Sequence, residues 1–136
     1  MMDEELNLRS YGLLIREGKI LVAEEIVCEK SIFKYPGGGV EPRETPENGL
    51  IREFLEETQM EISVIRLLYT PGTLFSPWIQ RRYTPLYYEV QGSEEPNVPK
   101  NEKIKLHFMD PKELLCSHKV ASPELVALNY ALGKDH

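Results

Sequence analysis

The sequence predicts an α/β or α+β sandwich in which strands outnumber helices. The chain has 136 residues, of which 41% are hydrophobic and 28% charged, a balance typical of a single globular domain over residues 1–136. Short apolar or alternating segments, separated by turns rich in glycine and proline, indicate strands along most of the chain. One strong helix signal lies between strands in mid-chain, which indicates a mixed α and β architecture.

The N-terminal third predicts a β-hairpin, a short strand and a glycine-rich segment. Apolar residues fill positions 10–16 and 19–26 on either side of Glu17-Gly18, which is the pattern of two strands joined by a tight turn. Residues 31–35 favour a further short strand. This strand runs into Pro36-Gly37-Gly38-Gly39, which we interpret as a break in regular structure.

The central helix is predicted from its first residues. Thr45 is a good N-cap and Pro46 fits the first helical position, so a helix should run from there to about Thr58. At about 100° per residue, one group of apolar side chains fills a single arc, which we expect to be the buried face. These residues are Leu50, Ile51, Phe54 and Leu55.

The second half of the chain alternates strands with polar loops and ends in a helix. Strands are expected at 60–69, 81–90 and 103–109, with a turn at Pro71-Gly72 and a polar loop over 91–101. Asp110-Pro111 predicts a short helical turn over 112–116, and Ser122-Pro123-Glu124 predicts a closing helix that ends at Gly133.

Composition argues against several classes of protein. The chain has 22 acidic and 16 basic residues, and a net charge of −6 is unlike that of a protein that binds the phosphate backbone of nucleic acids. A small anionic ligand remains compatible if a cation or a local basic patch neutralises it. No apolar run is long enough to cross a bilayer and the N-terminus is acidic, so we expect a cytoplasmic protein without a membrane partner. Cys28 and Cys116 lack metal or redox spacing, and we interpret them as free thiols.

Three glutamates of the predicted helix form a candidate metal site. Glu53, Glu56 and Glu57 stand at positions i, i+3 and i+4 beside the apolar arc, so their carboxylates converge. Like charges at this spacing repel by a few tenths of a kcal/mol per pair. Three hard oxygen donors suit a divalent cation such as Mg²⁺ or Mn²⁺. For the three glutamates alone, an ordinary solvated acidic face is the alternative.

The surrounding residues complete a longer pattern. From Gly38, five residues lead to Glu44, and seven more lead to Arg52-Glu53-Phe54-Leu55-Glu56-Glu57, with Met60 three further on. This arrangement resembles the Nudix box, Gly-x5-Glu-x7-Arg-Glu-U-x-Glu-Glu-x-Gly-U, in which U is a bulky apolar residue. Chance would produce such a match, even with one mismatch, in about one chain in a hundred thousand or fewer.

One position departs from the box. Gln59 stands where the family has a glycine that suits a left-handed helix exit. A glutamine in that conformation costs about 1–2 kcal/mol. We therefore expect either a reshaped exit or a Gln59 that stays helical, which affects the turn into the next strand and not the metal ligands.

The resemblance implies a fold, a reaction and a set of roles. The fold would be a Nudix-type α/β/α sandwich with a mixed β-sheet, and the reaction would be hydrolysis of the diphosphate linkage in a nucleoside diphosphate joined to another group. The implied cofactor is Mg²⁺, with Mn²⁺ as a substitute. The implied ligands are Glu53, Glu56, Glu57 and the carbonyl of Gly38, while Arg52 would orient the glutamates and Glu44 would brace the junction of loop and helix.

Family members often add an acidic ligand or base from a later loop. Glu102 fits that place best because it directly precedes the strand predicted at 103–109, with Glu94 and Glu95 as further candidates. Together with Glu53, these loop glutamates are candidates for the group that takes the proton of the attacking water. For each loop residue, a solvated surface charge is the alternative. By family analogy we also expect a homodimer.

Substrate choice rests on fewer residues. The segment 69–72 is similar to the proline region of ADP-ribose and nucleotide-sugar hydrolases of the family, although many β proteins hold such a turn. Trp78 and Tyr83 could stack on a nucleobase while Arg81 and Arg82 meet phosphates, and a place in the core or on the sheet surface is the alternative for the tyrosine. We favour ADP-ribose or a nucleotide sugar over a (deoxy)nucleoside triphosphate. A non-catalytic nucleotide sensor is the other alternative, disfavoured because every box glutamate is kept.

Overall fold

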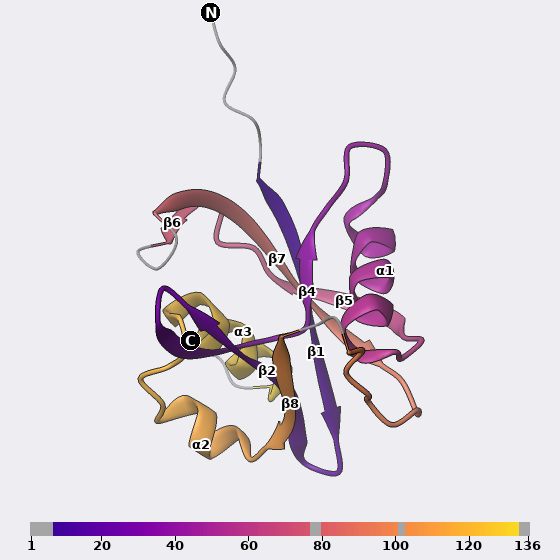
Figure 1. The fold of residues 1–136 in the computed structure, drawn as a ribbon, viewed down its shortest axis with the longest axis vertical. Coiled ribbons are helices and arrows are strands. Elements are labelled where there is room, and N and C mark those ends of the chain that lie inside the picture. The colour runs from indigo at the N-terminus through magenta and orange to yellow at the C-terminus, as the bar shows by residue number, and fades with distance from the viewer. Residues whose placement is uncertain (1–6, 77–79, 101–102, 134–136) are drawn as a thin grey trace, which may run out of the picture.

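The computed structural model describes residues 7–76, 80–100 and 103–133. Within these ranges the chain forms a mixed β-sheet with helices on both faces (Figure 1), so the predicted α/β class is confirmed. The elements in chain order are β1 (Leu8–Arg16), β2 (Lys19–Val27), β3 (Lys30–Lys34), β4 (Gly37–Gly39), α1 (Pro46–Thr58), β5 (Ser63–Tyr69), β6 (Leu74–Ser76), β7 (Arg81–Gln91), β8 (Ile104–Met109), α2 (Pro111–Leu115) and α3 (Ser122–Ala131).

Strand β1 lies at the centre of the sheet. The strands follow in the order β3-β2-β1-β7-β5, while β4 pairs with β1, β6 with β7 and β8 with β2. β1 runs parallel to β7 and antiparallel to β2 and β4. The predicted hairpin is confirmed at its turn, where Ile15 pairs with Ile20, but beyond the turn the two strands diverge to different partners. This divergence leaves the outer half of β1 free to pair with the glycine strand β4.

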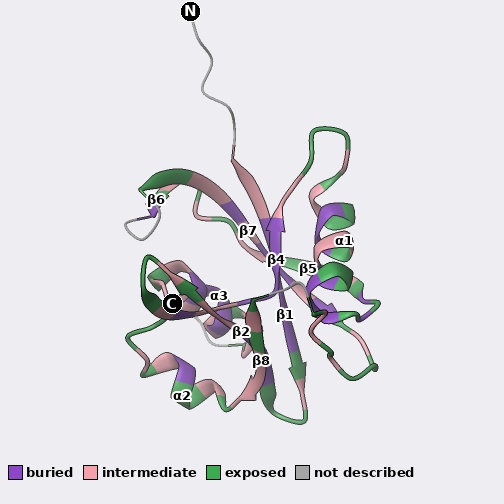
Figure 2. Ribbon diagram, in the orientation of Figure 1, coloured by how far each residue is buried: buried purple, intermediate pink, exposed green. Residues whose placement is uncertain are grey.

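Two hydrophobic clusters cover the two faces of the sheet, and much of β1 is buried between them (Figure 2). The cluster under α1 contains Leu14, Leu21, Leu50, Phe54, Met60, Ile62, Tyr88 and Val90. The cluster on the α3 face includes Tyr11, Leu13, Tyr35, Tyr87, Leu114, Ala127 and Leu128. Helix α1 is therefore held by one cluster, and the other face of the same strands is held by a second.

Helix α1 spans the predicted residues and begins at the predicted cap, since the Thr45 hydroxyl accepts a hydrogen bond from the Asn48 amide at 3.1 Å. Its buried face differs from the prediction. Leu50 and Phe54 are fully buried, but Ile51 and Leu55 are 36% and 47% exposed. The helix packs on β1 and β4 with its inward arc rotated toward Glu57 and Thr58, which are buried instead. The consequence is that a carboxylate of the box lies on the inner face.

The glycine run is a strand and not a break. Residues Gly37–Gly39 pair antiparallel with β1, with Tyr11 opposite Gly37 and Ser10 opposite Gly38. A Cβ at Gly37, whose φ is 149°, would overlap the carbonyl oxygen of Ser10. Glycine is depleted from strands in general, but it permits this close approach of two backbones. The prediction of a break was wrong because these glycines are needed for close contact with β1, a strand far away in the sequence, and local sequence signals do not reveal that contact.

The helix exit also differs from the prediction. Gln59 adopts the left-handed conformation, with φ 58° and ψ 24°, and its amide donates to Leu55 O. The loop after β7 holds this exit: Asn97 donates from Nδ2 to Gln59 Oε1 at 2.8 Å and from its amide to Thr58 O at 2.8 Å. These bonds offset the cost of a left-handed glutamine, so the family's turn is kept without the glycine.

The remaining elements follow the predictions with shifted ends. β5 begins at Ser63 because Met60 and Ile62 are buried in the core before the strand starts. β6 was not predicted, and it pairs with the start of β7. The short helix α2 and the closing helix α3 are confirmed, with α3 ending two residues before Gly133. Among the described residues, no helix has the length and apolar character that crossing a membrane would require.

Candidate active site

The box carboxylates meet the glycine strand where α1 lies beside β4. The amide of Gly37 donates to Glu57 Oε1 at 3.1 Å, and the Glu57 residue is only 6% exposed. A Cβ at Gly38 would lie 2.7 Å from the Glu53 carboxyl carbon. The glycines therefore form a backbone cradle into which two carboxylates fit, and this cradle is closed to any residue with a side chain.

Arg52 links the loop before the helix to the glutamates within it. Its guanidinium donates two hydrogen bonds to Glu44, from Nη2 to Oε1 at 2.6 Å and from Nε to Oε2 at 3.1 Å. Nη1 donates to Glu53 Oε1 at 3.1 Å and lies 3.4 Å from Glu56, while Nη2 also donates to the Gly39 carbonyl at 3.0 Å. Such two-pronged pairing fixes direction as well as distance. One cation thus positions the acidic side chains around the cradle.

Glu44 packs into the start of the helix. Its Oε1 accepts from the Glu41 amide at 2.9 Å, and a Cβ at Gly49 would lie 2.8 Å from the same oxygen. Hydrogen bonds from Arg52 hold the pKa of Glu44 below its ordinary value, with the Glu41 amide as a second cause. The same pair raises the pKa of Arg52. Both groups are therefore charged at neutral pH and tie the loop to α1.

The donor set suits a hard divalent cation. Glu53 lies against the backbone of Gly38 and Glu57 against that of Gly37, and burial raises the pKa of Glu53, since a half-buried charge lacks solvation that a cation could supply. As placed, no three Asp, Glu, His or Cys side chains within the described ranges are gathered into a ready-made metal cage. Glu56 is half-exposed and paired with Arg52. The carboxylates are of the chemical type that binds such an ion. Glu56 would have to rotate away from Arg52 to become a further ligand.

The cradle can be tested with a single added methyl group. We expect Gly38→Ala to displace Glu53 and to weaken Mn²⁺ binding by about 10–100-fold, the usual cost of disturbing the surroundings of a metal ligand. Electron paramagnetic resonance of bound Mn²⁺ gives the affinity. Gly39→Ala is the matched control, because a Cβ there would meet only Arg9 Nη1 at 4.0 Å. Equal Mn²⁺ affinity in the two variants would contradict the cradle.

A cavity of about 160 Å³ opens on the α3 face of the sheet. Its walls come from β1, β2, β3, β6, β7 and α3. The lining residues include Arg9, Tyr11, Glu25, Lys34, Tyr83 and Glu124. We call it the α3-face cavity. It combines aromatic side chains with both signs of charge, which is the composition of a site for a polar aromatic ligand.

Two cations connect this cavity to the box. Arg9 Nε donates to the Tyr11 hydroxyl at 2.7 Å, and although burial lowers the pKa of Arg9, the neighbouring Tyr11, Glu53 and Glu57 raise it above its ordinary value. Lys34 lies 3.3 Å from Glu25 and also interacts electrostatically with Glu57. The positive charge in the cavity therefore interacts with the carboxylates of the box.

The predicted substrate residues are only partly brought together. Tyr83 lines the α3-face cavity, and burial raises its pKa to about 12. Arg81 and Arg82 are exposed at the start of β7 and are not among the residues that line this cavity. Trp78 and Glu102 lie outside the described residues, so their roles stay predictions.

The other loop candidates have structural partners. Glu94 Oε1 accepts from the Glu61 amide at 2.6 Å, and Glu95 lies 3.6 Å from Arg16.

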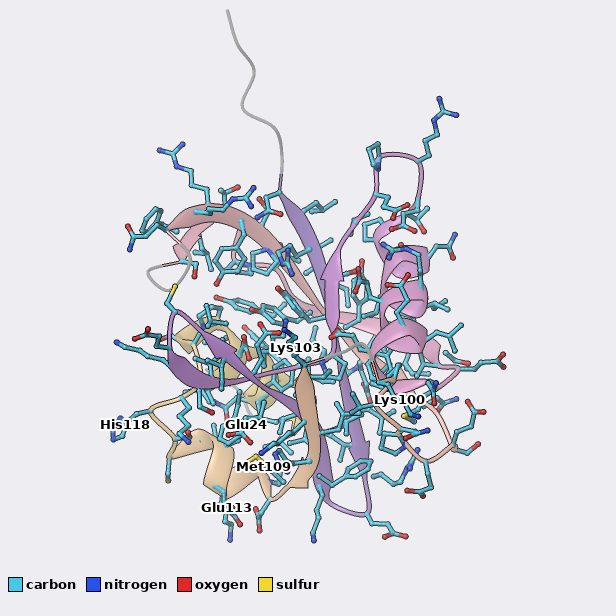
Figure 3. The ribbon with its side chains drawn as sticks, in the orientation of Figure 1. Glu24, Lys100, Lys103, Met109, Glu113 and His118 are labelled. Atoms are coloured by element: carbon cyan, nitrogen blue, oxygen red, sulfur yellow. The ribbon has the colours of Figure 1, made fainter. Side chains whose placement is uncertain are left out.

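A second hollow, near α2 and β8, is lined in part by Glu24, Met109 and Glu113 (Figure 3). There Glu24 is paired with His107 at 2.9 Å and with the Ser31 hydroxyl at 2.7 Å. These contacts account for the carboxylates without a ligand.

Sequence reasoning missed three residues of the α3-face cavity. Arg9 and Lys34 occur in strand segments, where a lone charge is usually taken to face solvent. The pairing of β1 with β4 brings Arg9 near the box, whereas Lys34 lies on β3, which pairs with β2. Glu124 follows Ser122-Pro123 and reads as an acidic residue in the first turn of a helix. One signal was available for Lys34, since it lies three residues before the glycine run.

The chain is similar to known proteins in sequence and in structure. The chain is similar to an RNA pyrophosphohydrolase of Pseudomonas aeruginosa, with 33% identity over 70 residues that make up 50% of this chain and 43% of that protein. The matched part of the chain thus spans less than half the length of these curated relatives. A NUDIX hydrolase from Nitrosomonas europaea has a similar structure, with a TM-score of 0.80 and 20% identity over 97% of this chain and 93% of that chain.

A second similar structure is that of an ADP-ribose pyrophosphatase from Streptococcus suis, with a TM-score of 0.68 and 16% identity over 97% of this chain and 96% of that chain. At such identities the two structures support the fold alone. The model of the NUDIX domain matches residues 6–128, which include the box and both faces of the sheet. The chain therefore belongs to the NUDIX family.

Proposed function

We propose that this chain hydrolyses a pyrophosphate bond in a nucleoside diphosphate derivative, in a reaction that depends on a divalent cation. The observation that carries the proposal is the arrangement of Arg52, Glu53 and Glu57 around the glycine strand β4, next to a cavity with two cations. Carboxylates for an ion and cations for phosphates are the two needs of phosphoanhydride hydrolysis.

The side chains have different roles in the proposed reaction. Glu53, Glu56, Glu57 and the Gly38 carbonyl would hold Mg²⁺, which when bound neutralises charge on phosphate oxygens and makes a water molecule nucleophilic. Arg52 holds Glu53 in position through the 3.1 Å hydrogen bond, and Glu44 holds Arg52.

Two further roles complete the proposal. Arg9 and Lys34 would receive the phosphates of the substrate from the cavity side. Glu53 is our candidate for the group that takes the proton of the attacking water, and Glu102 stays the candidate for an additional acid.

For the substrate we favour ADP-ribose or a nucleotide sugar over a (deoxy)nucleoside triphosphate. The support is the 69–72 segment and the position of Tyr83 on the cavity wall, where its ring can contact a base. The curated relatives raise a second candidate, the 5′ end of RNA. The net charge of −6 disfavours it, because an RNA substrate extends along the surface and needs cations there.

A substrate panel tests the proposal and separates it from a sensor. We expect Mg²⁺-dependent release of phosphate-bearing products from ADP-ribose or a nucleotide sugar, with slower turnover of nucleoside triphosphates and of 5′-triphosphorylated RNA. Rates at several salt concentrations identify an RNA activity, which would fall steeply with salt. Tight nucleotide binding without any product at millimolar Mg²⁺ would establish a sensor instead. Sedimentation of the same sample tests the proposed homodimer.

A further inference from the structure

Glu124 is a buried acid whose carboxyl group has no hydrogen-bond partner among the described residues. The residue is 8% exposed, its side chain lines the α3-face cavity, and within the described part of the chain no hydrogen bond reaches its carboxyl group. Its backbone carbonyl accepts from the Tyr35 hydroxyl at 2.7 Å, which anchors α3 without involving the acid. Lys34, a cation whose charge acts on this carboxyl group, is paired with Glu25 at 3.3 Å. A buried polar group without a partner is costly, so a ligand that satisfies it gains affinity.

The cavity has the size and walls for a flat ring. A dry cavity of about 150 Å³ can hold a benzene ring, and this one measures about 160 Å³. Tyr11 and Tyr83 contribute aromatic walls, and Val27 and Ile32 contribute apolar ones. Arg9 and Lys34 lie on the side that interacts with Glu57 of the box. A nucleotide with its phosphates at these cations would place its base among the tyrosines and within reach of Glu124.

The protonation state of Glu124 decides which base edge it can bind. Burial raises the pKa of Glu124 to about 8, opposed by Lys34, so the carboxyl is neutral at pH 6.5 and offers one donor beside one acceptor. When ionised, the Glu124 carboxylate offers acceptors only, which match two adjacent N–H groups such as those of guanine. The other ionisable groups that face it are Arg9, Tyr11, Glu25, Lys34, Tyr35, Tyr83 and Tyr87. The tyrosines have pKa values raised by burial and that of Lys34 is raised as well, so they keep their protons at pH 9.

We propose that Glu124 recognises the nucleobase, and that it selects an amidine edge, in which a ring nitrogen stands beside an exocyclic amino group as in adenine and cytosine. The acid proton is shared with the basic ring nitrogen while the other carboxyl oxygen accepts from the amino group. This pair is two-pronged, and its ring nitrogen is a stronger acceptor for the acid proton than the carbonyl oxygen that a keto edge offers, as in hypoxanthine or uracil. The inference rests on the proposed function and extends it to the choice of base.

Binding of nucleoside monophosphates without metal tests the proposal independently of catalysis. Isothermal titration calorimetry at pH 6.5 compares AMP with IMP and CMP with UMP, pairs that differ in this edge. We expect the wild-type chain to bind the amino member of at least one pair about tenfold more tightly. Glu124→Gln keeps the shape and both hydrogen-bonding groups but has no proton to share, so the ratio should fall to about one while IMP or UMP still binds.

Two controls separate recognition from a structural role. Ile32→Val removes one methylene group from the wall of the same cavity without changing a charge, and it should leave the AMP to IMP and CMP to UMP ratios unchanged, because a loss of packing weakens all ligands alike. At pH 9 the wild-type preference should shrink because Glu124 has lost its proton. The rings of IMP and UMP also begin to ionise near this pH, so Glu124→Gln gives the change that comes from the ligands, and the wild-type ratio should change by more than that.

Other results overturn the inference. A preference for GMP at pH 6.5, an unchanged ratio in Glu124→Gln, or no binding of any monophosphate each contradicts it. If Glu124→Gln keeps the wild-type ratio while the substrate panel still yields products, the base assignment fails and the hydrolase proposal stands. If the ratio changes as expected but the panel yields no product, the base assignment stands and the hydrolase proposal fails.

Discussion

Glu57→Gln is expected to lower the Mg²⁺-dependent rate by at least about 10²-fold without unfolding the chain. An amide oxygen at this position can still accept from the Gly37 amide, the hydrogen bond that now measures 3.1 Å, so the contact between α1 and β4 is kept. The negative charge is lost, and with it most of the attraction of this inner side chain for a divalent cation. The measurement is kcat for the best substrate of the panel, with the melting temperature recorded on the same sample.

The comparison variants make this result specific. Glu56→Gln should lower kcat comparably if Glu56 turns from Arg52 to the ion. Glu113→Gln removes an acidic charge on α2, away from the box, and should leave kcat within about twofold. Wild-type rates in both Glu56→Gln and Glu57→Gln would contradict the proposed metal site.

Phe54→Ala is expected to reduce the free energy of unfolding by about 3–5 kcal/mol. Phe54 is fully buried under α1, and its ring fills the space left by Gly12, where a Cβ would lie 2.8 Å from Phe54 Cε2. The ring therefore sets how closely the helix approaches β1. Because small domains have total stabilities of about 5–15 kcal/mol, this single change should bring the chain close to its limit. Urea denaturation followed by circular dichroism gives the value.

Leu55→Ala is the matched control on the same helix. Leu55 is 47% exposed, and we expect its truncation to cost less than about 1 kcal/mol. Equal losses in the two variants would mean that α1 is buried on the face expected from the sequence pattern and not on the face seen in the structure.

Local signals predicted the elements that depend on local physics. Thr45 and Pro46 determine where α1 begins through a side-chain hydrogen bond and a restricted backbone, and both act within four residues. The rotation of α1 could not be predicted in the same way, because Ile51 and Leu55 are as apolar as Leu50. Which of them is buried depends on the sheet, and the choice brings Glu57 inward at the expense of Leu55.

The box residues could be predicted and their surroundings could not. The spacing from Gly38 to Glu57 identified the acidic cluster and the role of Arg52 as its link. The glycine strand, the left-handed Gln59 and the cavity around Glu124 depend on contacts between segments far apart in the chain. In particular, a helix-start signal gave no indication that the Glu124 side chain turns into a cavity.

The most direct test is anomalous diffraction from a crystal soaked in millimolar Mn²⁺ with a non-hydrolysable nucleotide. We expect an anomalous peak within about 2.3 Å of carboxylate oxygens of Glu53, Glu56 and Glu57, next to the Gly38 carbonyl and the bound phosphates. A nucleotide bound with no Mn²⁺ peak at these carboxylates would contradict the account.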